Sequence, residues 1–252
     1  MSAAGSPAVP GREPELLGQT VVVIGGSSGI GLETARRARA EGAEVVLTAR
    51  DAGRLEHASR DIGARSTAAF DANDAESLAR YFDGLPAPID HVMITAGGPT
   101  YGSLLKMDAA DVRAAMSDRV VLGLDVARNA GAKMRPGGTL LMMGTTSDRR
   151  ISRELGIAPA AFAVLPPFVA SLALELAPVR VNLIAPGFVD TPLSASLLGA
   201  GLDHRREQLR STLPIGRVVG PADVAALAVH LMTNTAVTGA TFDIDGGEQF
   251  VD

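Results

Sequence analysis

The chain of 252 residues contains no cysteine. This absence excludes disulfide bonds, thiolate metal sites and thiol nucleophiles. The four histidines are scattered and show no ligand spacing along the sequence, so we predict no metal site. The sequence shows no run of about 18 apolar residues, and we therefore predict no transmembrane helix and no membrane partner.

An excess of basic residues is missing as well. The formal net charge is −5, which argues against a protein that binds nucleic acid through its phosphates. Hydrophobic residues make up 46% and charged residues 20%, proportions typical of a soluble globular protein. Residues 1–15 are rich in Ala, Gly and Pro and lack the basic start and apolar centre of a signal peptide. We predict a flexible tail over 1–15 and a cytoplasmic location.

The first structured unit is predicted to begin at Thr20. Residues 20–24 are apolar and β-branched, as expected of a strand buried on both faces. A glycine-rich turn follows, then a helical stretch over 32–41 that ends at Gly42, and a second strand over 44–48. The whole unit spans about 30 residues, the size of one βαβ crossover.

The same alternation continues through the chain. We predict five further strands, over 66–70, 91–95, 139–143, 179–184 and 241–244. Helical patterns lie between them, near 51–61, 74–83, 108–134 and 221–232. Strands separated by helices predict an α/β fold: a doubly wound, seven-stranded parallel sheet with helices on both faces. No linker or repeat divides it, so we predict a single Rossmann-type domain over 16–252.

Three glycines mark the first turn. Gly25, Gly29 and Gly31 lie between a predicted strand and the helix after it. Glycine permits a tight turn and a close approach of the backbone to a diphosphate, and the helix N-terminus adds free N–H groups and partial positive charge. This context indicates a dinucleotide site. The alternative is a turn that serves only the packing of helix on strand.

The order Gly-x-x-x-Gly-Ile-Gly is similar to the fingerprint of the short-chain dehydrogenase/reductase family, with Ile24 where the family usually has Thr. Other family-like segments follow in family order: Asp71, Thr95-Ala-Gly97, Arg180-Val-Asn182, Ala185-Pro-Gly187, Thr191, Pro214-Ile-Gly-Arg217, Pro221-Ala-Asp-Val224, Thr238-Gly239 and Asp245-Gly-Gly247. The resemblance covers about residues 18–250. It implies an oxidoreductase that uses a nicotinamide dinucleotide and assembles as a homodimer or homotetramer.

The resemblance also assigns residues to the cofactor. Asp71 corresponds to a residue that contacts adenine, and the loop from Ala185 to Thr191 to the part that binds the nicotinamide end. The full set of predicted cofactor residues is Gly25, Ser27, Ser28, Gly29, Ile30, Gly31, Arg50, Asp71, Ala72, Ala96, Gly97, Pro186, Gly187, Val189 and Thr191.

The end of the second strand indicates which dinucleotide is used. An acidic residue there would bind the ribose 2′-hydroxyl of NAD, but this sequence has Ala49 followed by Arg50. A guanidinium suits a 2′-phosphate, which favours NADP over NAD. The alternative is that Arg50 is an ordinary surface charge, partly neutralised by Asp51.

The family's catalytic pair has no counterpart here. In the family a Tyr transfers the proton and a Lys four residues later assists it; aligned by the resemblance, these positions fall on Ala158 and Phe162. No Tyr or Lys occurs anywhere from Leu140 to Asp252. Arg119 stands where the family has an active-site Asn.

Several groups could contribute to an altered site. Thr145 is the candidate for the family's upstream hydroxyl, with Thr146 and Ser147 as competitors. Replacement proton donors would be Tyr101, His204, Asp148 or Glu154, each of which could equally be a packing or surface residue.

Two further segments shape the predicted site. Pro166-Pro167 falls in a stretch that is one helix in the family, so we predict that the helix begins or kinks there and that residues 148–165 follow a nonstandard path. Residues 192–212 correspond to a substrate lid, and four leucines suggest its apolar inner face: Leu193, Leu197, Leu198 and Leu202. With Met142 and Met143 they indicate a largely apolar pocket, unless the methionines are ordinary core residues.

The sequence therefore predicts an NADP(H)-dependent oxidoreductase that acts on a small, largely apolar carbonyl, enone or imine. The missing pair leaves a second hypothesis, an NADP-binding protein without catalysis, and a third, a non-redox reaction on the same fold. Phe168, Leu172 and Leu176 could form an apolar seam between subunits or face the sheet.

Overall fold

In the computed structural model of the chain, seven parallel strands form one sheet in the order β3-β2-β1-β4-β5-β6-β7. The structure describes residues 14–149 and 153–251. The strands are β1 (Thr20–Ile24), β2 (Glu44–Ala49), β3 (Ser66–Ala69), β4 (Ile89–Ile94), β5 (Met134–Met143), β6 (Arg180–Pro186) and β7 (Thr241–Ile244). The predicted doubly wound Rossmann-type sheet is confirmed.

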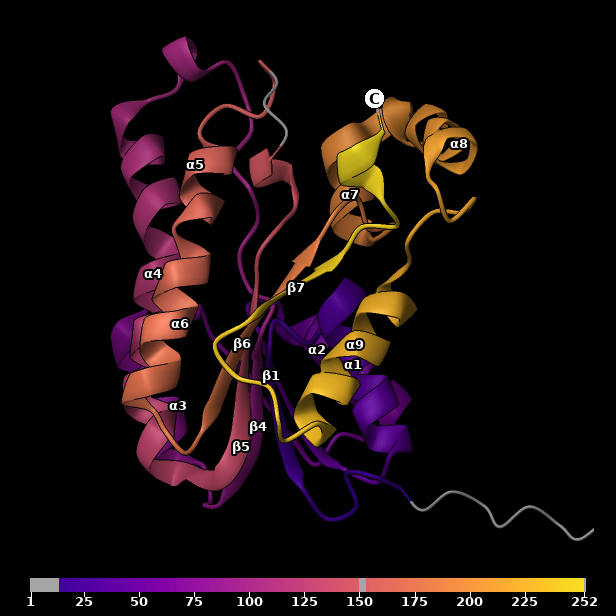
Figure 1. The fold of residues 1–252 in the computed structure, drawn as a ribbon. Coiled ribbons are helices and arrows are strands. Elements are labelled where there is room, and N and C mark those ends of the chain that lie inside the picture. The colour runs from indigo at the N-terminus through magenta and orange to yellow at the C-terminus, as the bar shows by residue number, and fades with distance from the viewer. Residues whose placement is uncertain (1–13, 150–152, 252) are drawn as a thin grey trace, which may run out of the picture.

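Helices cover both faces of this sheet (Figure 1). One face carries α1 (Gly29–Ala40), α2 (Ala52–Ile62) and α9 (Pro221–Thr233). The other carries α3 (Ala75–Gly84), α4 (Ala109–Ala130), α5 (Ala158–Ala163) and α6 (Leu165–Glu175). The helices α7 (Pro192–Leu198) and α8 (Leu202–Thr212) lie beyond the carboxyl ends of β6 and β7. Five short 3₁₀ turns complete the described elements: η1 (Leu104–Lys106), η2 (Gly131–Lys133), η3 (Ser147–Arg149), η4 (Gly199–Gly201) and η5 (Glu248–Phe250).

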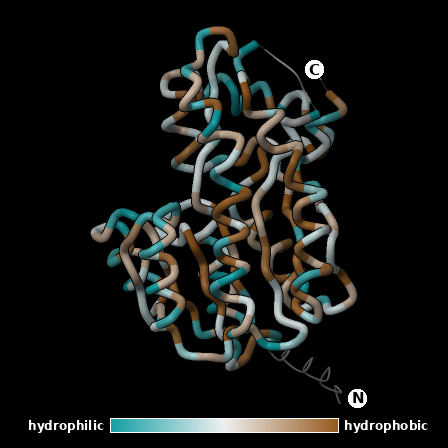
Figure 2. The backbone as a smooth tube through the Cα atoms, turned by 90° about the vertical axis from the view of Figure 1, so that its left-hand side faces the viewer, coloured by the Kyte–Doolittle hydropathy of each residue, from teal (hydrophilic) through white to brown (hydrophobic). Residues whose placement is uncertain are grey.

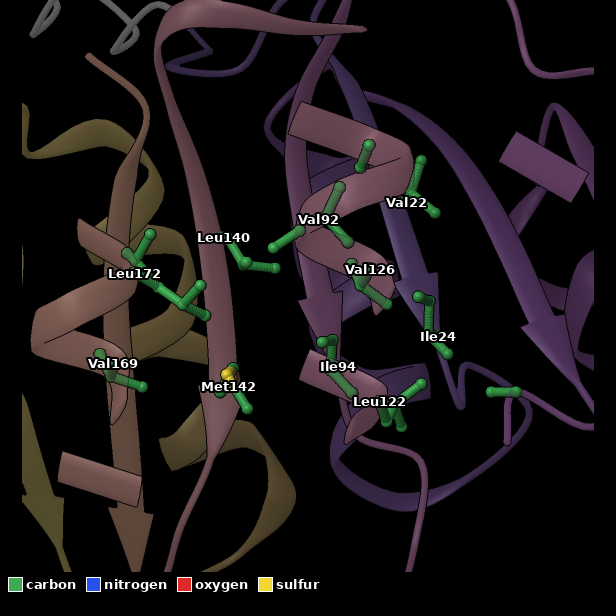
Figure 3. Close-up of a cluster of buried hydrophobic side chains, with 14 of the residues drawn as sticks. Val22, Ile24, Val92, Ile94, Leu122, Val126, Leu140, Met142, Val169 and Leu172 are labelled. Atoms are coloured by element: carbon green, nitrogen blue, oxygen red, sulfur yellow. The ribbon is translucent and has the colours of Figure 1, made fainter. Parts of the chain in front are cut away.

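Alternation along each strand builds two cores. In β1, Val22 and Ile24 face one layer of helices, while Val21 and Val23 face the other. Figure 3 shows Val22 and Ile24 in the first of these cores, and Figure 2 shows hydrophobic stretches running along the central strands. Burial on both faces explains why the strands read as nearly continuous apolar runs in the sequence.

The strand β5 begins five residues earlier than predicted. The sequence Arg135-Pro-Gly-Gly138 suggests a turn, yet Met134 pairs with Ile89 of β4, and the register shifts before His91 pairs with Thr139. The long helix correspondingly ends at Ala130 rather than at 134. Pairing with β4, which no local pattern reveals, decides this boundary.

The prolines divide the helix that follows β5, as predicted. α5 ends at Ala163, Val164 lies between the two helices, and α6 begins at Leu165 with proline in its first turn. The nonstandard path predicted for 148–165 lies partly outside the described residues, which omit 150–152. Where it is described, the path contains the short helix α5.

The expectation that no long apolar stretch exists is wrong. Residues Ala158–Glu175, taken together, are long and apolar enough to cross a membrane by length and composition alone. Leu165, Val169 and Leu172 of this stretch are buried in the core against the sheet. Figure 3 shows Val169 and Leu172 beside Leu140 and Met142 of β5. A core helix explains its apolar character.

The same contacts decide the orientation of the predicted subunit seam. Leu172 is 4% exposed, and Phe168 and Leu176 pack against the same core. These three residues therefore face the sheet, which was the alternative left open by their spacing.

His91 of β4 makes stability depend on pH. Its side chain is 3% exposed, its Nε2 lies 2.7 Å from Gln19 Oε1, and burial lowers its pKa to about 4. The unfolded chain, with a histidine pKa of about 6.5, binds a proton first as the pH falls. Stability from neutral His91 is therefore complete above pH ~6.5 and is lost progressively down to pH ~4, by about 3 kcal/mol.

Chemical denaturation at pH 7 and pH 4.5 measures this effect. We expect the free energy of unfolding of the wild type to fall more between the two pH values than that of His91→Gln, which does not titrate. Equal losses in both proteins would contradict the assignment to His91.

Candidate active site

The turn between β1 and α1 is built around glycine. Gly25 and Gly29 have φ angles of +96° and +55°, in the region that favours glycine. A Cβ atom on Gly25 would lie 2.6 Å from Thr95 Oγ1. A Cβ atom on Gly31 would overlap the carbonyl oxygen of Gly25 and approach the same Thr95 hydroxyl to 2.6 Å. The turn therefore packs closely against the end of β4 and leaves no room for side chains on its inner side.

The N-terminus of α1 is open to an anion. Ser28 is its N-cap residue but its side chain makes no capping hydrogen bond, and the first turn holds no acidic residue. By contrast, aspartates cap the N-termini of α2, α3 and α4. The N-cap and first turn of α1 thus place no carboxylate of their own at the positive end of the dipole, which suits the diphosphate of a dinucleotide. The residues present fit such a cofactor.

Loops from distant parts of the sequence surround this turn. A Cβ atom on Gly29 would lie 3.5 Å from Cβ of Thr191, which caps α7 by accepting a hydrogen bond from Ser194 N. On the other side, Thr95 Oγ1 donates to the carbonyl oxygens of Ile24 and Gly25 at 3.1 Å. The loops after β1, β4 and β6 therefore meet at the carboxyl edge of the sheet, where ligands of open α/β sheets bind.

Most residues predicted to form the nicotinamide loop are buried and pack against neighbouring elements. Pro186 ends β6 as a buried residue, and Val189 is 6% exposed. Gly187 lies so close to Glu248 Oε2 that a Cβ atom would overlap it. Ala96 and Gly97 follow β4 on the side of the glycine turn, and Ser27 and Ile30 lie in the turn itself and at the start of α1.

The predicted adenosine end lies beyond β2 and β3. Asp71 is exposed after β3, with Oδ1 accepting a hydrogen bond from Asn73 N at 3.0 Å, and Ala72 beside it is buried. Arg50 is exposed directly after β2. Asp51, the residue suggested to neutralise Arg50 in part, caps α2 and accepts from Arg54 N and Nε at 2.9 Å each. Within the described residues Arg50 makes no ion pair.

The positions aligned with the family's Tyr and Lys lie in the core. Ala158 is 4% and Phe162 8% exposed, and both belong to the core beneath α4. The guanidinium of Arg119, from α4, stacks on the Phe162 ring with Cζ 4.1 Å from the ring centroid. Sequence reasoning missed this stack, because it depends on the packing of α5 against α4.

The candidate polar groups occupy different environments. Thr145 is half-buried and its Oγ1 accepts a hydrogen bond from Ser147 N at 3.1 Å, while Thr146 is 2% exposed. Tyr101 is 45% exposed; burial of its hydroxyl raises its pKa, Arg119 opposes this rise and Glu248 adds to it. Tyr101 therefore stays protonated at neutral pH.

Two of the other candidate donors lie at the surface. His204 and Glu154 are exposed. The side chain of Asp148 falls outside the described part of the chain.

The segment 192–212 forms the helices α7 and α8, which lie beyond the carboxyl end of β6. Leu193, Leu197 and Leu198 are 49%, 47% and 39% exposed. Leu193 Cδ1 lies 3.8 Å from the Cβ position of Gly98, so it borders the loop after β4. Leu202, at the start of α8, is half-buried. These side chains leave apolar surface beside the site.

Two arginines of α8 anchor this segment through ion pairs. Arg206 donates to both carboxylate oxygens of Asp190, at 2.9 and 2.7 Å. Arg205 pairs with Glu248, whose other carboxylate oxygen accepts a hydrogen bond from Phe188 N at 2.7 Å. Glu248 was not anticipated from the sequence, since nothing near it in the chain indicates a buried role.

The two methionines are not both pocket residues. Met142 is 3% exposed and packs in the core against Gly123, so its predicted place in the pocket lining is wrong. Met143 is half-buried and contacts the opposite core. Because β5 lies between two layers of helices, successive side chains such as Met142 and Met143 enter opposite cores.

A separate hollow of about 950 Å³ lies at the opposite, amino end of the sheet. Its lining includes Gln19, His91, Arg135 and His230. It is remote from the glycine turn. Within residues 14–149 and 153–251, no group of three His, Asp or Glu side chains is arranged to hold a metal ion.

Comparison with known proteins agrees with this arrangement. A sequence profile described as "Enoyl-(Acyl carrier protein) reductase" matches residues 24–249. The chain is 27% identical to the short-chain dehydrogenase/reductase ATR9 of Stachybotrys chlorohalonatus, over 93% of this chain and 98% of the relative. It is 31% identical to the NADP-dependent (R)-specific alcohol dehydrogenase of Lentilactobacillus kefiri, over 92% and 97%. The crystal structure of BdcA in complex with NADPH superposes with a TM-score of 0.82 at 25% identity, covering 92% of this chain and 95% of that one. The chain belongs to the short-chain dehydrogenase/reductase family of oxidoreductases.

Proposed function

We propose that the protein is an NADP(H)-dependent oxidoreductase with an atypical active site. Its reaction would be hydride transfer to or from a small carbonyl, enone or imine compound. The observation that carries the proposal is the open glycine turn, whose helix N-terminus has no acidic residue and faces Thr191 across the carboxyl edge of the sheet. Relatives described as NADP-dependent or bound to NADPH support it.

The residues of the turn would bind the dinucleotide through the backbone. The N–H groups at the start of α1 would hold the diphosphate, with Gly25, Gly29 and Gly31 allowing its close approach. Asp71 and Ala72 would border the adenine, and the loop from Pro186 to Thr191 the nicotinamide end. When bound, the dinucleotide supplies or accepts a hydride, and a proton from water or an acidic side chain completes the reduction.

Arg50 would select NADP over NAD. An exposed guanidinium without an ion-pair partner among the described residues can hold a 2′-phosphate in two charge-assisted hydrogen bonds. We expect Arg50→Ala to weaken NADPH binding about tenfold, a loss of ~1.4 kcal/mol at this exposed position, and to change NADH binding by less than about twofold.

Isothermal titration calorimetry with both dinucleotides measures this preference. Arg60→Ala, which removes an exposed arginine from the far end of α2, is the matched control and should bind NADPH like the wild type. An equal loss for NADPH and NADH in Arg50→Ala would contradict the role of Arg50.

The chain from Leu140 to Asp252 holds neither Tyr nor Lys, and this makes the proposed site atypical. The aligned positions, Ala158 and Phe162, are apolar and buried. General acid–base catalysis contributes roughly 10²–10⁴-fold, so a protein that still orients substrate and dinucleotide would keep a slow activity. Thr145 remains the candidate for orienting a substrate oxygen, and Tyr101 for donating a proton.

The same observation favours a second candidate, an NADP-binding protein without catalysis. The two candidates differ in turnover alone. Calorimetry with NADPH tests binding, and NADPH oxidation with a panel of ketones, enones and imines tests hydride transfer. Binding with turnover supports the oxidoreductase, binding without turnover on any class supports the non-catalytic protein, and absence of binding overturns both.

Three further features are proposed with this function. Residues 192–212 would act as a lid over the substrate, anchored by Arg205 and Arg206. The protein would form a homodimer or homotetramer. A cytoplasmic location stays a prediction from the composition.

A further inference from the structure

Arg119 is a half-buried cation that pairs with no carboxylate in the part of the chain that the structure describes. It lies on α4, and its described contacts are the Phe162 ring, 4.1 Å from Cζ, and the loop at Gly97, whose Cβ position is 4.0 Å from Nη2. It forms no ion pair within residues 14–149 and 153–251. Arg205 and Arg206, also half-buried at this end of the molecule, each pair with a carboxylate.

The surroundings of Arg119 penalise its charge. Burial lowers its pKa, and only Asp118 and Tyr101 oppose this effect. Asp118 is exposed and is the adjacent residue in the chain. The aromatic face of Phe162 compensates only part of the lost hydration, because a cation–π contact is weaker than the hydration of a guanidinium. An anion placed against the free edge of the guanidinium would be stabilised.

The position of Arg119 connects this charge to the proposed site. Gly97 is two residues beyond Thr95, whose hydroxyl contacts the carbonyl oxygens at the glycine turn. Leu193 borders the next residue of the same loop, Gly98, from the side of α7. Arg119 therefore lies where the loop after β4 faces both the glycine turn and the segment 192–212.

Tyr101 places a second donor in the same region. Its hydroxyl interacts electrostatically with Arg119 and stays protonated at neutral pH. A guanidinium offers two parallel N–H donors and no acceptor, and a protonated phenol can add one O–H donor. This donor set matches a planar oxyanion such as a carboxylate.

We propose that Arg119 binds a carboxylate of the substrate, so that the compound reduced or oxidised carries an acid group beside an apolar chain. This inference rests on the proposed function, whose site it shares. It refines the expectation of a largely apolar substrate: apolar contacts would come from Leu193 and Leu197, and charge recognition from Arg119. Arg119 is then a specificity-determining residue.

The first test measures binding and needs no turnover. Calorimetry of the NADPH-loaded protein with hexanoate and hexanamide compares a carboxylate with a neutral ligand of the same shape. We expect hexanoate to bind about tenfold or more tightly than hexanamide, because hydrogen bonds to a charged group are stronger than those to a neutral one. Arg119→Met should abolish this preference, and Arg119→Lys should keep part of it.

The matched control is Arg113→Met, which removes an exposed arginine from the same helix. It should retain the preference for hexanoate. Circular dichroism and the melting temperature check that each variant is folded. Equal binding of both ligands by the wild type, or a preference that survives in folded Arg119→Met, would overturn the proposal.

A second test separates recognition of a carboxylate from an effect on the reacting oxygen. It compares 2-oxohexanoate with its methyl ester as substrates. We expect Arg119→Met to raise KM for the acid and to leave the ester nearly unchanged. An equal fall in kcat for both would overturn the proposal. If neither substrate reacts in any protein, the oxidoreductase function fails, and the calorimetric comparison still decides the role of Arg119.

Discussion

Gly31→Ala is expected to lose NADPH binding by about 100-fold. The added Cβ would overlap the carbonyl oxygen of Gly25 and lie 2.6 Å from Thr95 Oγ1, so the turn and the first residues of α1 must move. Displacing two N–H groups from the diphosphate forfeits about two charge-assisted hydrogen bonds, and each 1.4 kcal/mol is a factor of ten. The same crowding should lower the free energy of unfolding by about 1–3 kcal/mol.

Calorimetry and denaturant unfolding measure the two effects on one preparation. Gly84→Ala is the control, since Gly84 ends α3 at the surface and nothing lies within 4 Å of its Cβ position. That variant should match the wild type in both measurements. A folded Gly31→Ala protein with unchanged affinity for NADPH would show that the diphosphate does not lie at this turn.

Arg180→Met is expected to cause the largest loss of stability, about 3 kcal/mol or more. Arg180 is 6% exposed, and its guanidinium donates to the carbonyl oxygens of Leu231 and Met232 at 2.7 Å and, at longer distances, to those of Val237 and Gly137. Methionine fills the volume but leaves these buried acceptors without a donor, and each costs about 1–3 kcal/mol. The positive charge also compensates the C-terminal end of α9.

Urea unfolding of Arg180→Met, with Arg60→Met as an exposed control, tests this role. Hydrogen exchange should show the last turn of α9 and the segment before β7 exchanging faster in the Arg180 variant, because the guanidinium that donates to their carbonyl oxygens is lost. A change below about 1 kcal/mol would mean that water or neighbouring groups satisfy these acceptors instead.

The family resemblance singled out Arg180 and Asn182 in the sequence but did not predict what their side chains do. In the sequence they lead into the predicted nicotinamide loop, yet both side chains point to the strand connections. Asn182 Nδ2 donates to Val237 O at 3.1 Å, and its Oδ1 accepts from Ala240 N. They hold the chain from α9 to β7 against β6 and thereby position the loop that follows β6.

The sequence by itself determined the order of elements and the position of the glycine turn. Apolar β-branched runs, helical stretches and glycines act locally, so their pattern predicted β1 and β7 to the residue. The two prolines predicted a helix break near Pro166, and the structure places it at Val164. The absence of Tyr and Lys after Leu140 is likewise a property of the chain alone.

Only the tertiary structure decided which side chains meet. Packing brings Arg119 onto the Phe162 ring and Arg205 next to Glu248. It also directs the Asp51 carboxylate to Arg54. The inward orientation of Phe168, Leu172 and Leu176 was undecided from their spacing for the same reason. Burial and charge pairing depend on the neighbours that folding brings together, and no local pattern in the chain encodes those neighbours.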